Sequence, residues 1–136
     1  MPYPINKAPL NAGDITYEIK DGILFVERHA REEYTFEKLK INVGRRLKYT
    51  EGFSYPMILF GKDMLSIDKM GRDYMATEGA KNALSRAFVV EKAQGKLALN
   101  FFIERYKQIV PAKVFENMDE AIEWSKQLRK TMNDKL

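Results

Sequence analysis

The sequence has no cysteine, and histidine and tryptophan occur once each, as His29 and Trp124. Without cysteine, the chain forms no disulfide and offers neither a thiolate metal ligand nor a cysteine nucleophile. One histidine with scattered carboxylates supplies no metal-ligand set and no nucleophile–base pair, so we read His29 as a surface residue at the end of a strand. The glycines match neither the P-loop nor the dinucleotide-binding motif. We therefore expect no catalytic residue, no cofactor and no metal site.

Long apolar runs and blocks of like charge are also missing. No apolar run approaches the ~20 residues that cross a bilayer, and the Met-Pro-Tyr-Pro start lacks the apolar region of a secretory signal. We expect a cytoplasmic protein without membrane insertion. The net charge of +4 comes from basic residues that are interleaved with acidic ones. This pattern favours solvated helix faces over a nucleic-acid or anionic-lipid surface, for which Arg45, Arg46 and Lys48 are the candidate face.

What is present fits one globular domain. The 136 residues are 45% hydrophobic and 31% charged, and they contain no internal repeat, linker or low-complexity segment. Residues 1–13 hold three prolines and little periodic pattern. We therefore predict an irregular N-terminal lead-in over residues 1–13 and a single domain over residues 14–136.

The first half of the chain predicts a hairpin followed by a helix. Apolar alternation in residues 14–20 and strand-favouring residues in 23–27 indicate two strands. Asp21-Gly22 between them is the sequence that a two-residue type I′ turn prefers. Thr35 is suited to cap the helix that follows, and helical spacing predicts its buried stripe: Phe36, Leu39, Val43 and Leu47.

In the second half, the apolar runs 57–60 and 87–90 predict two short strands covered on both faces, and residues 113–115 predict a third short strand. Helices are expected to begin near Ser66, at Ala93 and after Asn117. In the last of these, Asn117 and Glu120 resemble a capping box, and Ala121, Trp124 and Leu128 form the core stripe.

The helix expected from Ala93 has two candidate faces that could pack inward. Leu97, Phe101 and Ile103 are the residues we expect to pack inward. Phe102 and Tyr106 share a different face. An apolar face exposed on this helix would indicate oligomerisation.

The order β-β-α-β-α-β-α-β-α places helices between the later strands, and such crossovers make neighbouring strands parallel. The hairpin adds an antiparallel pair. We predict an α/β fold with a mixed, mainly parallel sheet of about five strands and about four helices.

Segments spread over the chain after residue 14 carry a family resemblance: residues 21–26, 34–38, 55–60, 100–102 and 112–124. Together with the order of elements, they resemble the STAS domain of bacterial anti-anti-sigma factors. They are more similar still to small bacterial proteins described as SpoIIAA-like. The resemblance implies a single-domain STAS-like fold. None of the segments is a catalytic signature, so it implies a non-enzymatic protein.

The resemblance also points to a regulatory loop. In anti-anti-sigma factors, a partner kinase phosphorylates a serine or threonine at the start of the second helix, and this switches binding of an anti-sigma protein. Ser66 is the matching residue here, with Leu65 before it where the family pattern has aspartate. Two other interpretations stay open for Ser66, a helix N-cap and a small-anion site. The residues around it complete the candidate interaction site: Lys62, Asp63, Asp68 and Lys69.

The leading hypothesis is therefore a non-enzymatic, STAS-like regulatory module that binds a protein partner through the loop around Ser66, with a homodimer as an open alternative. A second hypothesis is a carrier of a small molecule or lipid, which a contiguous apolar cavity between sheet and helices would favour. A nucleic-acid partner is the least favoured, because the basic residues are not clustered.

Overall fold

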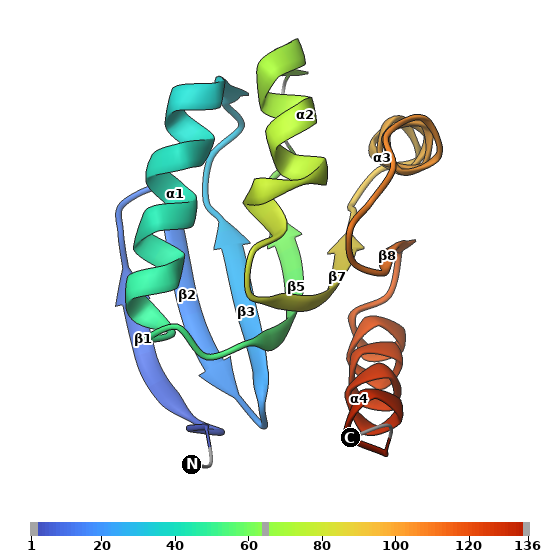
Figure 1. The fold of residues 1–136 in the computed structure, drawn as a ribbon. Helices are drawn as coiled ribbons and strands as arrows, with labels where there is room; N and C mark the ends of the chain where they lie inside the picture. Colours follow the sequence, from blue (N-terminus) through green and yellow to red (C-terminus); the bar gives the residue numbers. More distant parts are fainter. Residues whose placement is uncertain (1–2, 64–65, 135–136) are drawn as a thin grey trace.

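The computed structural model describes residues 3–63 and 66–134. A mixed sheet with strand order β1-β2-β3-β5-β7-β8 forms its centre (Figure 1). Strands β1, β2 and β3 pair antiparallel, and β3, β5, β7 and β8 pair parallel. The sheet strands are β1 (Lys7–Asn11), β2 (Ile15–Lys20), β3 (Ile23–Arg28), β5 (Tyr55–Gly61), β7 (Ala83–Val89) and β8 (Ala112–Phe115). The predicted mixed, mainly parallel α/β sheet is confirmed, with six strands among the described residues.

Strand β1 is a correction to the predicted irregular lead-in. Residues 7–11 pair with β2, and Leu10 lies opposite Tyr17. The strand is at the edge of the sheet, so only one side of its backbone has to pair, and Pro9, which has no N–H to donate, is tolerated there. The register shifts between Lys7 and Leu10. An edge strand with mostly exposed side chains needs no apolar alternation, so the sequence carried no strand signal there.

The hairpin between β2 and β3 is confirmed. Asp21 and Gly22 have φ angles of 52° and 76°, as a type I′ turn requires. The apolar residues of β2 alternate as predicted, because Ile15, Tyr17 and Ile19 all point into the core.

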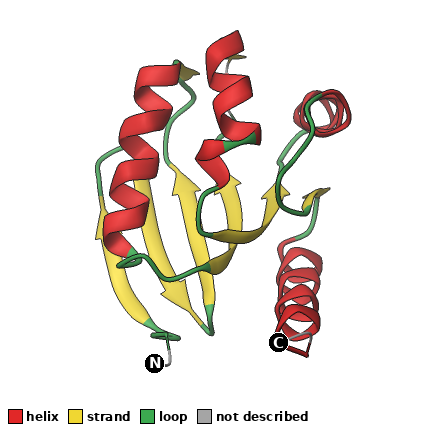
Figure 2. Cartoon of the chain, viewed as in Figure 1, coloured by secondary structure: helices red, strands yellow, loops and turns green. Residues whose placement is uncertain are grey.

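Helices cover both faces of the sheet (Figure 2). On one face lie α1 (Phe36–Tyr49), α2 (Lys69–Ala76), a short 3-10 turn (Glu78–Ala80) and α3 (Ala93–Arg105). Helix α4 (Met118–Asp134) packs against β5 and β7 from the opposite face, where Ala121 meets Ile58 and Ala87. The small parallel pair β4 (Glu33–Tyr34) and β6 (Ser66–Ile67) joins the segments that precede α1 and α2.

Two of the predicted helix caps, at the starts of α1 and α4, are confirmed. The side chain of Thr35 accepts a hydrogen bond from the backbone N–H of Lys38 at 3.2 Å, which confirms it as the cap of α1. The side chain of Asn117 accepts one from the N–H of Glu120 at 3.1 Å at the start of α4. None of the helices in the described ranges has the length and apolar character that a membrane crossing requires.

Two predictions about helix faces were wrong. Arg46, expected on a solvated face of α1, is only 3% exposed, so the candidate nucleic-acid face loses its central residue. On α3, Leu97 and Phe101 were expected inside but are 71% and 59% exposed, while Phe102 is buried. Helix α3 has apolar residues on more than one face, so its periodicity could not decide which face would pack inward.

Candidate functional site

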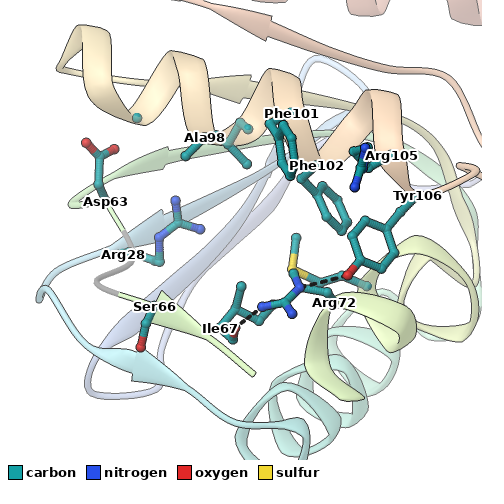
Figure 3. Close-up of a pocket in the computed structure, with 13 residues that line it drawn as sticks. Arg28, Asp63, Ser66, Ile67, Arg72, Ala98, Phe101, Phe102, Arg105 and Tyr106 are labelled. Atoms are coloured by element: carbon teal, nitrogen blue, oxygen red, sulfur yellow. Dashed lines mark hydrogen bonds between the residues drawn. The ribbon is translucent and has the colours of Figure 1, made fainter. Parts of the chain in front are cut away.

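A cavity of about 700 Å³ lies beyond the carboxyl ends of β3 and β5, between α2 and α3 (Figure 3). Ligands of open α/β sheets bind at this edge, and the volume is that of a small-molecule site. Its walls come from the end of β3, the segment after β5, β6, α2 and α3: Arg28, Asp63, Ser66, Ile67, Arg72, Met75, Gly95, Ala98, Leu99, Phe101, Phe102, Arg105 and Tyr106. We call this space the α2–α3 pocket.

Arg28 is the most deeply placed charge of the α2–α3 pocket. It follows Leu24 and Val26 on the inward face of β3 and is only 7% exposed. Its Nε donates a hydrogen bond to the carbonyl of Lys62 at 2.9 Å. Burial lowers the pKa of Arg28, and the nearby Tyr34 and Asp63 raise it in part. Within the described ranges, no carboxylate comes within 4 Å of its guanidinium.

Arg72 is held from two sides. Its Nε donates to the hydroxyl of Tyr106 at 2.9 Å and its Nη1 donates to the carbonyl of Ile67 at 2.6 Å (Figure 3). These bonds connect the first turns of α2 to β6 and to the end of α3. The guanidinium is therefore fixed in orientation at the pocket wall.

Asp63 is the one acidic side chain in the pocket wall. A Cβ placed on Gly95 would lie 3.0 Å from its Oδ2, so the carboxylate packs against the first turn of α3. Partial positive charge at a helix N-terminus favours a carboxylate in that position. Three arginines, Arg28, Arg72 and Arg105, share the same walls, so positive charge dominates the pocket.

The rest of the wall is apolar and aromatic. Phe102 and Tyr106 stack with their ring centres 5.3 Å apart. Arg105 lies over the ring of Phe101, with its guanidinium carbon 5.1 Å from the ring centre. A ligand that fits these walls has an apolar body and a negatively charged group.

The candidate residues proposed around Ser66 lie in and beside this pocket. Asp63 and Ser66 line it, and Ser66 is exposed at its rim. Lys62 contributes its carbonyl to Arg28, and its side chain is exposed like that of Lys69. Met64 and Leu65, which lie between Asp63 and Ser66 in the sequence, are outside the described residues.

The helix-cap interpretation of Ser66 was wrong. Helix α2 begins at Lys69, and its cap is Asp68, whose Oδ1 accepts a hydrogen bond from the N–H of Gly71 at 2.7 Å. Ser66 instead belongs to β6, where it pairs with Glu33 of β4. The cap lies two residues later than predicted because the short β4–β6 ladder takes up Ser66 and Ile67 before the helix can start.

The arginines and aromatic residues of the pocket were not predicted as site residues. One signal was available: Arg28 continues the inward face that Leu24 and Val26 begin, and a charged residue on a core face marks either a structural tie or a binding site. Arg72 and Tyr106 carried no such signal, because they meet only through the packing of α2 against α3.

His29 is exposed, and its Nε2 lies 2.6 Å from the hydroxyl of Thr16 on the neighbouring strand. In the parts of the chain that the structure describes, acidic and histidine side chains form no cluster able to hold a metal ion. The chemical character of the site therefore rests on its arginines and its apolar walls.

The fold belongs to the SpoIIAA-like class. The chain is similar to the crystal structure of an uncharacterised protein of the DUF3478 family from Shewanella loihica PV-4, which has a SpoIIAA-like fold. The TM-score is 0.50 and the identity 12%, over 92% of this chain and 98% of the other. Residues 17–129 match the family described as a domain of unknown function, DUF7793, and the chain belongs to that family. No curated protein matches the sequence.

Proposed function

We propose that this protein is a non-enzymatic binding module whose ligand is a small organic anion with an apolar body, held in the α2–α3 pocket. The observation that carries the proposal is the position of Arg28, buried at the base of a cavity of about 700 Å³ with an aromatic wall. This is the carrier hypothesis, and it is supported by the contiguous cavity that the hypothesis requires.

Burial of the Arg28 guanidinium costs free energy. Asp63 offsets that cost only in part, because no described carboxylate lies within 4 Å of the guanidinium. A bound carboxylate or similar group would compensate it further with charge-assisted hydrogen bonds. Arg72 is already fixed by Tyr106 and Ile67, so a ligand would lose little free energy in ordering it. The aromatic side of α3 would cover the apolar body.

Binding without catalysis is supported by the chemistry of the walls. Ser66 is the one serine among the lining residues, and no threonine, cysteine or histidine lines the pocket with it. The polar groups are mainly arginines, which remain protonated and suit anion recognition better than proton transfer.

The test uses isothermal titration calorimetry with two probes of the same shape, phenylbutyrate and its neutral amide, phenylbutyramide, which differ only in the charged or neutral head group. We expect the carboxylate to bind at least about tenfold more tightly, because a hydrogen bond to a charged group contributes about 1.5–3 kcal/mol. Arg28→Gln should remove this preference. Arg31→Gln, an exposed arginine close by in the chain, is the matched control and should keep it. Equal binding of both probes by the wild-type protein would contradict the proposal.

A protein-interaction module is the second candidate, and the outer side of α3 favours it. Leu97 and Phe101, one helical turn apart, are 71% and 59% exposed beside the pocket. Such apolar exposure suits a protein partner or a second copy of the chain. Ser66 is accessible at the rim, and a phosphate there would add negative charge to the same surface.

This candidate is tested by affinity capture with wild-type protein, Ser66→Ala and Ser66→Asp, and by sedimentation of the purified protein. A specific partner that is kept by wild type and Ser66→Ala but lost by Ser66→Asp supports a charge-operated switch. The protein-interaction candidate is contradicted if the protein sediments as a monomer and the three captures retain the same proteins.

A further inference from the structure

A second, smaller cavity of about 80 Å³ lies between the sheet and the helices α1 and α2. Arg46 of α1 and Arg86 of β7 line it, and each is only 3% exposed. Arg28 lines both this cavity and the α2–α3 pocket. Arg46 and Arg86, in contrast, line the smaller cavity and not the α2–α3 pocket.

The two buried arginines are bonded only to neutral oxygens within the described ranges. Arg46 Nη2 donates to the carbonyl of Gly79 at 3.1 Å. Arg86 donates from Nη1 to the carbonyl of Met75 at 2.5 Å and from Nη2 to Oε1 of Gln108 at 2.7 Å. No carboxylate of the described chain lies within 4 Å of either guanidinium.

The electrostatics of this pair are unfavourable as they stand. Burial and, after it, the charge of Arg46 lower the pKa of Arg86 to about 10. Burial also lowers the pKa of Arg46. Both side chains remain cations at neutral pH, so two like charges share a low-dielectric interior without a counter-charge among the described residues.

Polar atoms in the same walls still lack acceptors. Arg86 Nε, Asn42 Nδ2 and the hydroxyl of Tyr34 are buried, and none has a hydrogen-bond partner among the described residues. All three residues line the small cavity. Buried polar groups are normally paired, so a cluster of potential donors around one cavity indicates an acceptor inside it.

We propose that this smaller cavity binds a small inorganic anion, with Arg46 and Arg86 as its counter-charges and Asn42 and Tyr34 as further donors. The volume suits this class of ligand: a buried water needs about 10–15 Å³ of accessible cavity volume, so about 80 Å³ has room for a halide or a small oxyanion. The apolar body expected in the α2–α3 pocket would not fit. The proposal does not depend on the function proposed for that pocket.

The first experiment measures thermal unfolding in potassium chloride, nitrate and phosphate at constant ionic strength, with gluconate, which is too large for the cavity, as reference. A ligand that binds only the folded state raises the Tm with its concentration. We expect a rise of roughly 5 °C for the anion that fits best. Equal Tm values in all four salts would overturn the proposal, because they would show that none of these anions binds preferentially to the folded protein.

The second experiment locates the site with bromide as the probe. Crystals of the full chain are soaked in potassium bromide and the anomalous signal is measured. A peak between Arg46 and Arg86 supports the proposal. Bromide peaks at the surface alone, with none in the cavity, contradict it whatever the salts do to the Tm.

Asn42→Asp supplies the matched variant, because it places a carboxylate of nearly the same shape in the cavity wall. With an internal counter-charge, the protein should lose most of the anion dependence of its Tm. Arg45→Gln changes the net charge by the same amount on the exposed side of α1 and should keep that dependence. An unchanged anion dependence in Asn42→Asp counts against the cavity. Phenylbutyrate binding should be the same in both variants, which separates this site from the α2–α3 pocket.

Discussion

Arg72 and Tyr106 join the start of α2 to the end of α3. The Nε of Arg72 donates to the Tyr106 hydroxyl at 2.9 Å, and its guanidinium carbon lies 5.9 Å from the centre of the same ring. The two residues are 34 positions apart in the sequence. Their contact fixes a charge at the wall of the α2–α3 pocket and ties α2 to the end of α3.

Tyr106→Phe removes only the hydroxyl from this contact. The ring can still stack on Phe102, so we expect a fold that is intact but loses about 1 kcal/mol of unfolding free energy. Arg72 is then held by Ile67 alone, and the affinity for phenylbutyrate should fall about three- to tenfold. Calorimetry and urea unfolding measure the two effects. Tyr3→Phe, which lies near Tyr55 and outside the pocket walls, is the control and should bind as wild type.

Asp68→Ala and Ser66→Ala distinguish the observed helix start from the predicted one. Asp68 caps α2 through the N–H of Gly71, so its loss should lower the free energy of unfolding by about 1 kcal/mol. Ser66 caps nothing and is exposed, so Ser66→Ala should stay within about 0.5 kcal/mol of wild type. Urea unfolding of the two variants checks the pair. If Ser66→Ala were the less stable of the two variants, Ser66 rather than Asp68 would be the cap of α2.

The features that could be predicted from the sequence are those set by local chemistry. Asp21-Gly22 requires positive φ angles at both positions, and Thr35 caps the backbone three residues ahead, so neighbouring residues were enough to locate them. The parallel sheet followed from apolar strands alternating with helices. Strand β1 could not be predicted in this way, because among the described strands it pairs with β2 alone and most of its side chains face solvent.

The binding features depend on packing between distant segments and were therefore not predictable from local patterns. Arg46 has the local setting of a surface residue of α1, yet the 3-10 turn at Gly79 gives it a buried acceptor. Arg28, Arg72 and Tyr106 meet only where three elements converge. The predicted loop did reach the pocket through Asp63 and Ser66, because the carboxyl ends of parallel strands lie at one edge of the sheet.

Gly61→Ala tests how closely β5 approaches β3 at the base of the pocket. Gly61 has a φ angle of +96°, and a Cβ there would lie 2.3 Å from the carbonyl oxygen of Arg28. We expect a loss of about 2 kcal/mol or more in unfolding free energy, from backbone strain and from steric overlap. Because Arg28 must shift, phenylbutyrate should also bind more weakly.

Gly44→Ala is the matched control for that substitution. Gly44 lies inside α1, and a Cβ at this position would meet nothing within 4 Å. Alanine favours the helix, so this variant should gain about 0.5–1 kcal/mol and bind phenylbutyrate as wild type does. Urea unfolding measures both variants. A Gly61→Ala protein as stable as wild type would be inconsistent with the contact between β5 and Arg28.

The ionisation of Tyr17 is expected to lower the free energy of unfolding at alkaline pH. Its hydroxyl donates to the carbonyl of Asn42 at 3.0 Å, and burial raises the pKa of Tyr17 to about 12, although Arg45 and Arg46 lower it in part. Below about pH 10, the phenol is neutral in both the folded and the unfolded chain. Between about pH 10 and pH 12, the unfolded chain loses the proton first, so the contribution of Tyr17 to stability is lost as the pH rises.

Tyr17→Phe should therefore cost less at high pH than at neutral pH. At pH 8, the variant loses the hydrogen bond to Asn42, and we expect it to be about 1 kcal/mol less stable than wild type. At pH 11, wild type has itself lost about 1 kcal/mol through ionisation of unfolded Tyr17, so the difference should nearly close. Urea unfolding of both proteins at the two pH values measures the change. A difference that stays constant would mean that Tyr17 ionises as readily in the folded protein as in the unfolded chain.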